Sequence, residues 1–220
     1  MTYLGPNGDF DSGPSLVVAI DDGVLNITFN TILPLAMERL LTVVNADDAV
    51  RVVVLRGYGT GSFGELATNT AQTQLSRSLS QPVLVMVHGM CNPQAVALIE
   101  TCDIVICADD ATFEAPNQPN SPLNAQAAQK QGLVSISVPA SELESHTDTL
   151  ARELANKDTL ALRFTKQTLR RVPDIPWNEV LAFTSAKQIE LKALQAGRPS
   201  ARASAIESFL AGKSKPGAGA

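Results

Sequence analysis

The residues with the clearest chemical potential lie in the stretch 82–117. Two apolar runs of strand length, 83–87 and 104–108, flank a glycine turn at Gly89 and a segment that begins with Pro93, which suits the first turn of a helix. A strand, a tight turn and a helix start aim backbone N–H groups at one place, where an anion or a polarised carbonyl could bind. An ordinary buried βαβ unit without a ligand gives the same pattern.

Two motifs in this stretch resemble the signature of the crotonase (enoyl-CoA hydratase/isomerase) superfamily. The first is HGMCNPQA at 88–95, and the second is CDIVICADDATF at 102–113. The second motif matches the family pattern closely, whereas the family's three glycines fall on Pro93, Gln94 and Ala95. The resemblance implies an α/β crotonase-like (ββα) spiral fold with a C-terminal helical region. The alternative is a generic doubly wound sheet, and two layers of turn-linked strands would distinguish the crotonase type from it.

The family polarises a thioester carbonyl with two backbone N–H groups, which form an oxyanion hole. By resemblance, the first N–H belongs to Leu66 in the glycine-punctuated loop 57–67, or to Glu65 if the alignment has a one-residue gap. The second belongs to Gln94. Because Pro93 has no N–H and a fixed φ, we expect only one amide of the usual loop pair to face the site. The same resemblance implies contacts with coenzyme A at the residues Gly64, Gly89 and Lys213.

The general acid and base of family hydratases are two glutamates, and their positions hold Ala97 and Asn117 here. Neither a methyl group nor an amide exchanges a proton near neutral pH. Glu100 and Glu114 lie three residues away from these two positions, and Glu65 is the carboxylate of the glycine-rich loop. Each of the three is equally read as an ordinary surface carboxylate. The candidate catalytic residues are therefore Leu66, Gln94, Asn117, Glu114 and Glu65.

The spacing of apolar residues and the positions of turn-forming residues predict the strands and helices around this region. Asp21, Asp22 and Gly23 separate two strand-like runs, which predicts a β-hairpin. Residues 118–123 are rich in turn formers. The pattern predicts further elements in this order: a helix over 31–44, a buried strand over 50–55, and a strand over 132–139.

The last third of the sequence reads as a series of helices. A capping box at 141–144 opens a helix through Leu154, and Asp158 can cap the next one, through Arg171. A long helix is expected at 177–196, and a last helix at 200–211. This region resembles the trimerisation region of crotonases, especially hydroxycinnamoyl-CoA hydratase-lyases, whose tyrosine position holds Ser185. We expect four segments: a loose N-terminus at 1–14, a core at 15–139, a helical oligomerisation region at 140–211, and a disordered tail at 212–220.

Composition narrows the functional classes. The net charge of −5 and the lack of a basic stripe argue against nucleic-acid binding. No apolar run approaches membrane-spanning length, so we expect a soluble chain. The three cysteines are expected to be free thiols in a reducing cytoplasm. Two histidines are too few for a His-rich metal site.

Two classes of function remain. The first is an enzyme that acts on a small-molecule acyl-CoA thioester by hydratase, isomerase or lyase chemistry. It would use coenzyme A thioester as substrate without a bound cofactor, and would form a homotrimer or a dimer of trimers. The second is a catalytically silent crotonase homologue that serves as a binding or assembly subunit.

Overall fold

The computed structural model describes residues 16–29, 40, 43–57, 78–115 and 118–196. Tertiary contacts divide the chain into two compact units, residues 1–156 and 157–220. All described strands belong to the first unit, and the described part of the second unit is helical.

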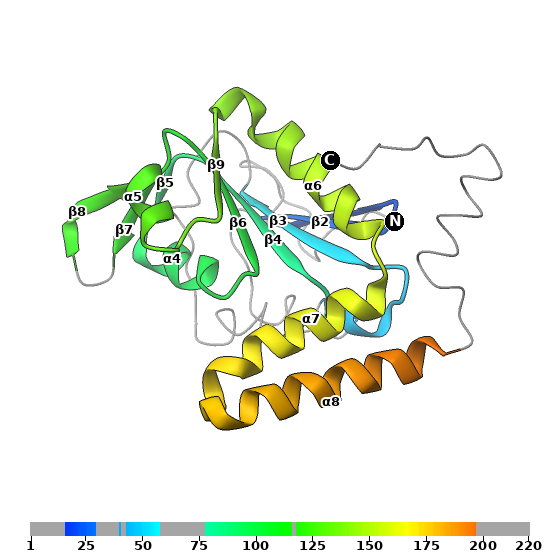
Figure 1. Ribbon diagram of the computed structural model, residues 1–220. Coiled ribbons are helices and arrows are strands. Elements are labelled where there is room, and N and C mark those ends of the chain that lie inside the picture. Colours follow the sequence, from blue (N-terminus) through cyan, green and yellow to red (C-terminus); the bar gives the residue numbers. More distant parts are fainter. Residues whose placement is uncertain (1–15, 30–39, 41–42, 58–77, 116–117, 197–220) are drawn as a thin grey trace, which may run out of the picture. The chain divides into compact units, whose positions relative to one another are not determined.

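The first unit contains a six-stranded sheet with the strand order β1-β2-β3-β4-β6-β9 (Figure 1). Its strands are β1 Leu16–Asp21, β2 Val24–Phe29, β3 Val52–Gly57, β4 Val83–Val87, β6 Ile104–Ala108 and β9 Ile136–Val138. β1 and β2 pair antiparallel, and the other neighbours pair parallel. The predicted hairpin is confirmed, with Asp22 at φ 46° and Gly23 at φ 81° in its turn. Both φ values are positive, a conformation that favours Gly and that Asp tolerates better than bulkier residues.

A second, three-stranded sheet has the order β5-β7-β8. Its strands are β5 Met90–Cys91, β7 Thr112–Ala115 and β8 Gln118–Asn124. β4 and β6 of the large sheet each turn within a few residues into β5 and β7 of the small one (Figure 1). The strands therefore form two turn-linked layers, which is the arrangement that separates the crotonase type from a single doubly wound sheet.

The turn formers at 118–123 were recognised in the sequence, but the strand they form was not. β8 pairs antiparallel with β7 and lies at the edge of its sheet. Proline lacks the N–H that a central strand must donate, and an edge strand tolerates this loss. The expected strand at 132–139 is shorter than predicted, because β9 comprises Ile136–Val138 alone.

The large sheet is buried on both faces. Val83, Val85 and Val87 of β4 belong to one hydrophobic cluster, whereas Leu84 and Met86 belong to another. The first cluster includes residues of α4 (Pro93–Ile99) and α5 (Ala125–Lys130), and the second includes residues of α6 (Leu143–Ala155). Helices on both faces explain why the central strands read as continuous apolar runs.

Helix α6 begins differently from the prediction. A 3₁₀ turn at Ala140–Glu142 precedes it, and the residue that caps it is Glu142, without a side-chain hydrogen bond. The predicted capping box, which would begin at Ser141, therefore does not form. Instead the Ser145 hydroxyl donates to the Glu142 carbonyl oxygen at 3.0 Å. Pro139 leads directly into the 3₁₀ turn, so the chain is already turning helically where an extended capping residue would be needed.

The described part of the second unit is a pair of helices, α7 (Thr159–Arg171) and α8 (Trp177–Gln195), joined through a 3₁₀ turn at Val172–Asp174. The predicted Asp158 cap is confirmed, since its Oδ1 accepts from the Ala161 N–H at 2.7 Å. Lys187 Nζ lies 5.2 Å from the centroid of the Phe164 ring and joins the two helices. The predicted helix at 200–211 lies outside the described residues.

Candidate functional site

The turn from β4 into the small sheet depends on the backbone conformation of Gly89. Its φ of 66° lies in the left-handed region, where glycine is the least strained residue. The Gly89 carbonyl oxygen accepts from the Thr112 N–H at 3.0 Å, and Met90 and Cys91 then pair with β7. These contacts fix the direction in which the chain enters α4.

The first turn of α4 offers one backbone donor among its described residues. Asn92 caps the helix by accepting from the Ala95 N–H through Oδ1 at 2.8 Å, and its carbonyl oxygen accepts from the Val96 N–H at 3.0 Å. Pro93 has no N–H. Gln94 is exposed, and its N–H has no hydrogen-bond partner among the described residues. The Gln94 N–H is thus the group of this turn that can bind an incoming acceptor.

The carboxylates near α4 belong to different elements. Ala97 lies within α4 and is partly buried, whereas Glu100 forms the C-terminal cap at the far end of the helix and is exposed. Glu114 lies on β7 and is partly buried. Glu100 instead contributes to the wall of a separate cleft at the C-terminal end of α4.

The other candidate residues cannot be placed. Gly64, Glu65 and Leu66 lie outside the described residues, as do Asn117 and Lys213. The distance between the two expected oxyanion amides, those of Leu66 and Gln94, therefore stays a matter of prediction.

Two of the three cysteines are fully buried beside this turn. Burial raises the pKa of the Cys91 thiol to about 12, with a further contribution from Cys107. Burial also raises the pKa of Cys107, against an opposing hydrogen bond with Ser137. Cys102 is partly exposed and donates its S–H to the Leu98 carbonyl oxygen at 3.6 Å. The buried thiols are held neutral and act as small apolar side chains of the core.

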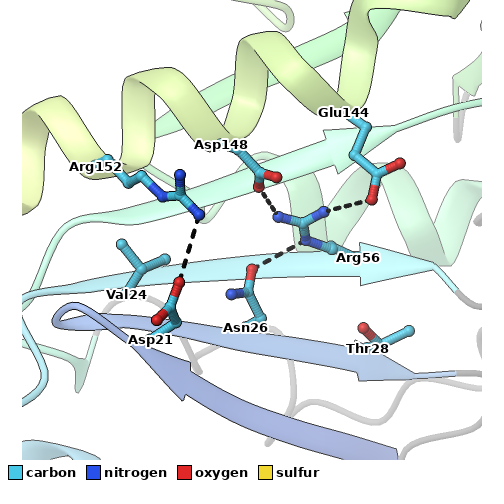
Figure 2. Close-up of a pocket in the computed structure, with 8 residues that line it drawn as sticks. All are labelled: Asp21, Val24, Asn26, Thr28, Arg56, Glu144, Asp148 and Arg152. Atoms are coloured by element: carbon cyan, nitrogen blue, oxygen red, sulfur yellow. Dashed lines mark hydrogen bonds and ion pairs between the residues drawn. The ribbon is translucent and has the colours of Figure 1, made fainter.

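A polar cleft of about 310 Å³ lies between the hairpin end of the large sheet and α6 (Figure 2). Arg56 of β3 stands at its centre, with a side chain that is only 12% exposed. Arg56 Nε donates to Asn26 Oδ1 at 3.1 Å, and its two terminal nitrogens contact Glu144, at 3.5 Å, and Asp148. Farther along the cleft, Arg152 Nη2 lies 3.4 Å from Asp21 Oδ2.

The interactions in this cleft join α6 to the sheet. Glu144, Asp148 and Arg152 are spaced four residues apart and so share one face of α6. Each guanidinium nitrogen of Arg56 contacts an oxygen atom of the protein, so the charge of Arg56 is already paired within the fold. We therefore assign the Arg56 cluster a structural role. Sequence reasoning missed it, although the spacing on α6 was a usable signal.

The described residues contain no group of three or more His, Cys, Asp or Glu side chains that could hold a metal ion. Nor does any helix in the described part of the chain combine the length and apolarity needed to cross a membrane.

Comparisons with known proteins agree on one fold. No protein-family model matches the chain. It is 28% identical over 177 residues to hydroxycinnamoyl-CoA hydratase-lyase of Pseudomonas fluorescens, in an alignment that covers 66% of this chain and 63% of that protein. It is 25% identical over 171 residues to the mitochondrial enoyl-CoA hydratase domain-containing protein 3 of Mus musculus, covering 64% of this chain and 54% of that protein. The chain therefore spans less than two thirds of the length of these relatives.

A solved structure of enoyl-CoA hydratase from Bacillus anthracis superposes with a TM-score of 0.77 at 17% identity, covering 91% of this chain and 97% of that one. The two turn-linked layers of strands and this superposition define a crotonase-type α/β fold. The sequence similarity to the curated relatives, together with this fold, supports the resemblance to the crotonase superfamily that was read from the sequence.

Proposed function

We propose that this chain binds an acyl-CoA thioester and polarises its carbonyl with the backbone N–H of Gln94, assisted by that of Leu66. The observation that carries the proposal is the backbone N–H of Gln94, an exposed residue, which has no hydrogen-bond partner among the described residues. Donors fixed in place before the substrate arrives stabilise charge on a carbonyl oxygen without reorganisation. The class of chemistry proposed is that of a hydratase or lyase, words that the names of the curated relatives carry, or of an isomerase, which the family resemblance adds.

Proton transfer in this site is proposed to be weak. Ala97 stands where resemblance places the first acid, and Glu100 caps the opposite end of α4. A methyl group cannot exchange a proton, and a carboxylate at the far end of the helix is displaced from the Gln94 amide. The same observation supports a second candidate, a catalytically silent homologue that serves as a binding or assembly subunit.

Assembly as a homotrimer or a dimer of trimers is part of the proposal. It is supported by large apolar side chains on α8, where Trp177 is 87% exposed, Leu181 77% and Ile189 69%. Soluble monomers seldom leave such a group of side chains in water. Closed rotational symmetry is the usual way in which identical chains bury them.

Isothermal titration with a panel of acyl-CoA thioesters tests the proposal. We expect saturable binding of at least one thioester, and weaker binding by about tenfold in Gln94→Pro, which removes the N–H donor. The matched variant Gln94→Ala keeps the backbone N–H and should bind within about twofold of the parent. Absence of binding by every thioester would favour the silent subunit. Equal binding by both variants would exclude the Gln94 amide as the donor.

A further inference from the structure

A second cleft lies at the C-terminal end of α4, away from the Gln94 amide, and has a volume of about 340 Å³. This volume falls at the lower end of the range of about 300–1,000 Å³ that is typical of small-molecule sites. Ile99 and Phe113 in its lining are fully buried. The remaining large apolar side chains of the lining are Val96, Val105, Leu123 and Leu133.

The charged groups of this cleft all carry one sign. Its lining includes the carboxylates Glu100 and Asp103, and none of its described lining residues is a lysine, arginine or histidine. Asp103 Oδ2 accepts from the Val83 N–H at 2.8 Å. Glu100 is exposed, and no described side chain or backbone donor bonds its carboxylate. Glu100 is thus the charged group in this cleft that is available to a ligand.

Three observations favour a positively charged ligand. The cleft holds two carboxylates and no cation, so a carboxylate or phosphate on the ligand would be repelled. The C-terminal end of a helix likewise favours positive charge, and Glu100 caps that end of α4. The apolar lining favours a hydrocarbon or aromatic body over a fully polar molecule.

We propose that this cleft, which the acyl-CoA proposal does not use, binds a small cationic amphiphile: an aromatic or aliphatic body against the partly exposed Leu123 and Leu133, with an ammonium group paired to Glu100. The preference of this cleft for a positively charged ligand distinguishes it from a site for acyl-CoA, because the phosphates of coenzyme A are anionic. Glu100 would pair with the charge of the ligand, and because Glu100 is exposed, solvent keeps this interaction modest.

Cys102 provides a location-specific reporter of occupancy. It lines the cleft and is partly exposed, whereas Cys91 and Cys107 are fully buried. Burial raises the pKa of both buried thiols, so their reactive thiolate forms are suppressed. Iodoacetamide should therefore alkylate Cys102 first in the folded protein, with loss of iodide and of the thiol proton.

The test titrates the full-length protein with three probes of similar size: 2-phenylethylamine, 2-phenylethanol and 3-phenylpropionate. We expect the protonated amine to bind most tightly and the carboxylate most weakly, and saturating amine to slow Cys102 alkylation. Glu100→Gln should weaken amine binding about three- to fivefold, while Glu153→Gln, an exposed acid on α6 outside the cleft, should leave it unchanged.

Three results would overturn the proposal: no binding by any probe, equal or tighter binding of the alcohol or the carboxylate, or binding that leaves Cys102 alkylation unaltered. A titration of the parent protein with acyl-CoA tests the proposed function separately. Failure at one site therefore does not imply failure at the other.

Discussion

Single residues at the start of α4 determine which backbone groups the site can offer. Asn92 takes up the Ala95 N–H, and Pro93 removes a second donor. Gln94 is left to present its N–H to an acceptor. Different residues would thus serve binding and proton transfer. The proposed carbonyl-binding donor at Gln94 can be kept even though Ala97 occupies the position that, by resemblance, belongs to a catalytic acid.

Hydration of crotonyl-CoA by the purified protein should be very slow or absent. Loss of a positioned acid or base typically lowers the rate by about 10²–10⁴-fold. By resemblance, two positions that hold glutamates in family hydratases hold Ala97 and Asn117 here. The loss of enoyl-thioester absorbance measures the rate. Turnover at an ordinary hydratase rate would contradict the expectation. Recovery of activity in Asn117→Glu alone would show that carbonyl polarisation is intact.

Stability should decline at alkaline pH because of the buried thiols. The folded-state pKa of Cys91 is raised from 9.0 to about 12, so the folded protein retains a proton that the unfolded chain releases. This thiol therefore costs no stability below the unfolded-state pKa, and stability falls as pH rises from about 9 toward about 12. The slope has an upper limit of about 1.4 kcal/mol per pH unit for one thiol.

Urea unfolding between about pH 8 and about pH 10.5, under a reducing agent, measures this slope. Cys91→Ala should lower stability at pH 8 through loss of packing, yet flatten the alkaline decline relative to the parent. Cys102→Ala is the matched control, because Cys102 is only partly buried. Parallel pH profiles for the parent and Cys91→Ala would show that Cys91 ionisation does not contribute.

At the scale of elements, the Arg56 cluster joins α6 to the sheet through side chains. Arg56 and Asp148 are 92 residues apart in sequence, and Arg56 and Asn26 are 30 apart. Arg56 is largely shielded from solvent, whereas Asp21 and Arg152 are more than half exposed. The central contacts should therefore contribute more than the outer pair, because solvent screens exposed ion pairs.

Arg56→Met should lower the free energy of unfolding by about 1–2 kcal/mol, since it removes two ion pairs and one hydrogen bond while keeping much of the side-chain volume. Asp21→Asn should change it by less than about 0.5 kcal/mol. Denaturant unfolding of both variants provides the comparison. An equal effect of the two changes would show that shielding of Arg56 has no energetic consequence.

Sequence reasoning succeeded where local pattern and burial agree. β4 and β6 begin and end as predicted, because both faces of the central strands are apolar, and α4 begins at Pro93 as predicted. It did not predict the strand β8, because at the edge of the sheet a strand can form in spite of its two prolines. It also predicted a capping box at Ser141, where the structure has a 3₁₀ turn. The Arg56 cluster was missed because its partners are far apart in sequence.

For the candidate site, the motif located Gln94 in the first turn of α4 but could not show which amides lack partners. That property depends on Asn92, whose side chain reaches forward to the Ala95 N–H. The partner expected at Leu66 lies outside the described residues, so its role stays a prediction.

At the scale of the whole molecule, the exposed apolar side chains of α8 predict assembly. We expect light scattering at micromolar concentration to give the mass of a trimer or a dimer of trimers, against 23.3 kDa for one chain. Replacing Trp177 and Leu181 by lysine should shift the mass downward, because charged side chains oppose burial in an interface. A stable mass near one chain in the parent protein would contradict the expectation.

The central claim is that the Gln94 amide polarises a bound thioester carbonyl, and the carbonyl itself reports this most directly. Acyl-CoA labelled with ¹³C at the thioester carbonyl should show a downfield shift of that resonance on binding, because hydrogen bonding withdraws electron density from the carbon. Gln94→Ala should preserve the shift, and Gln94→Pro should abolish most of it, provided that a thermal melt shows both variants folded. A bound thioester whose carbonyl resonance does not move, or moves equally in both variants, would contradict the account.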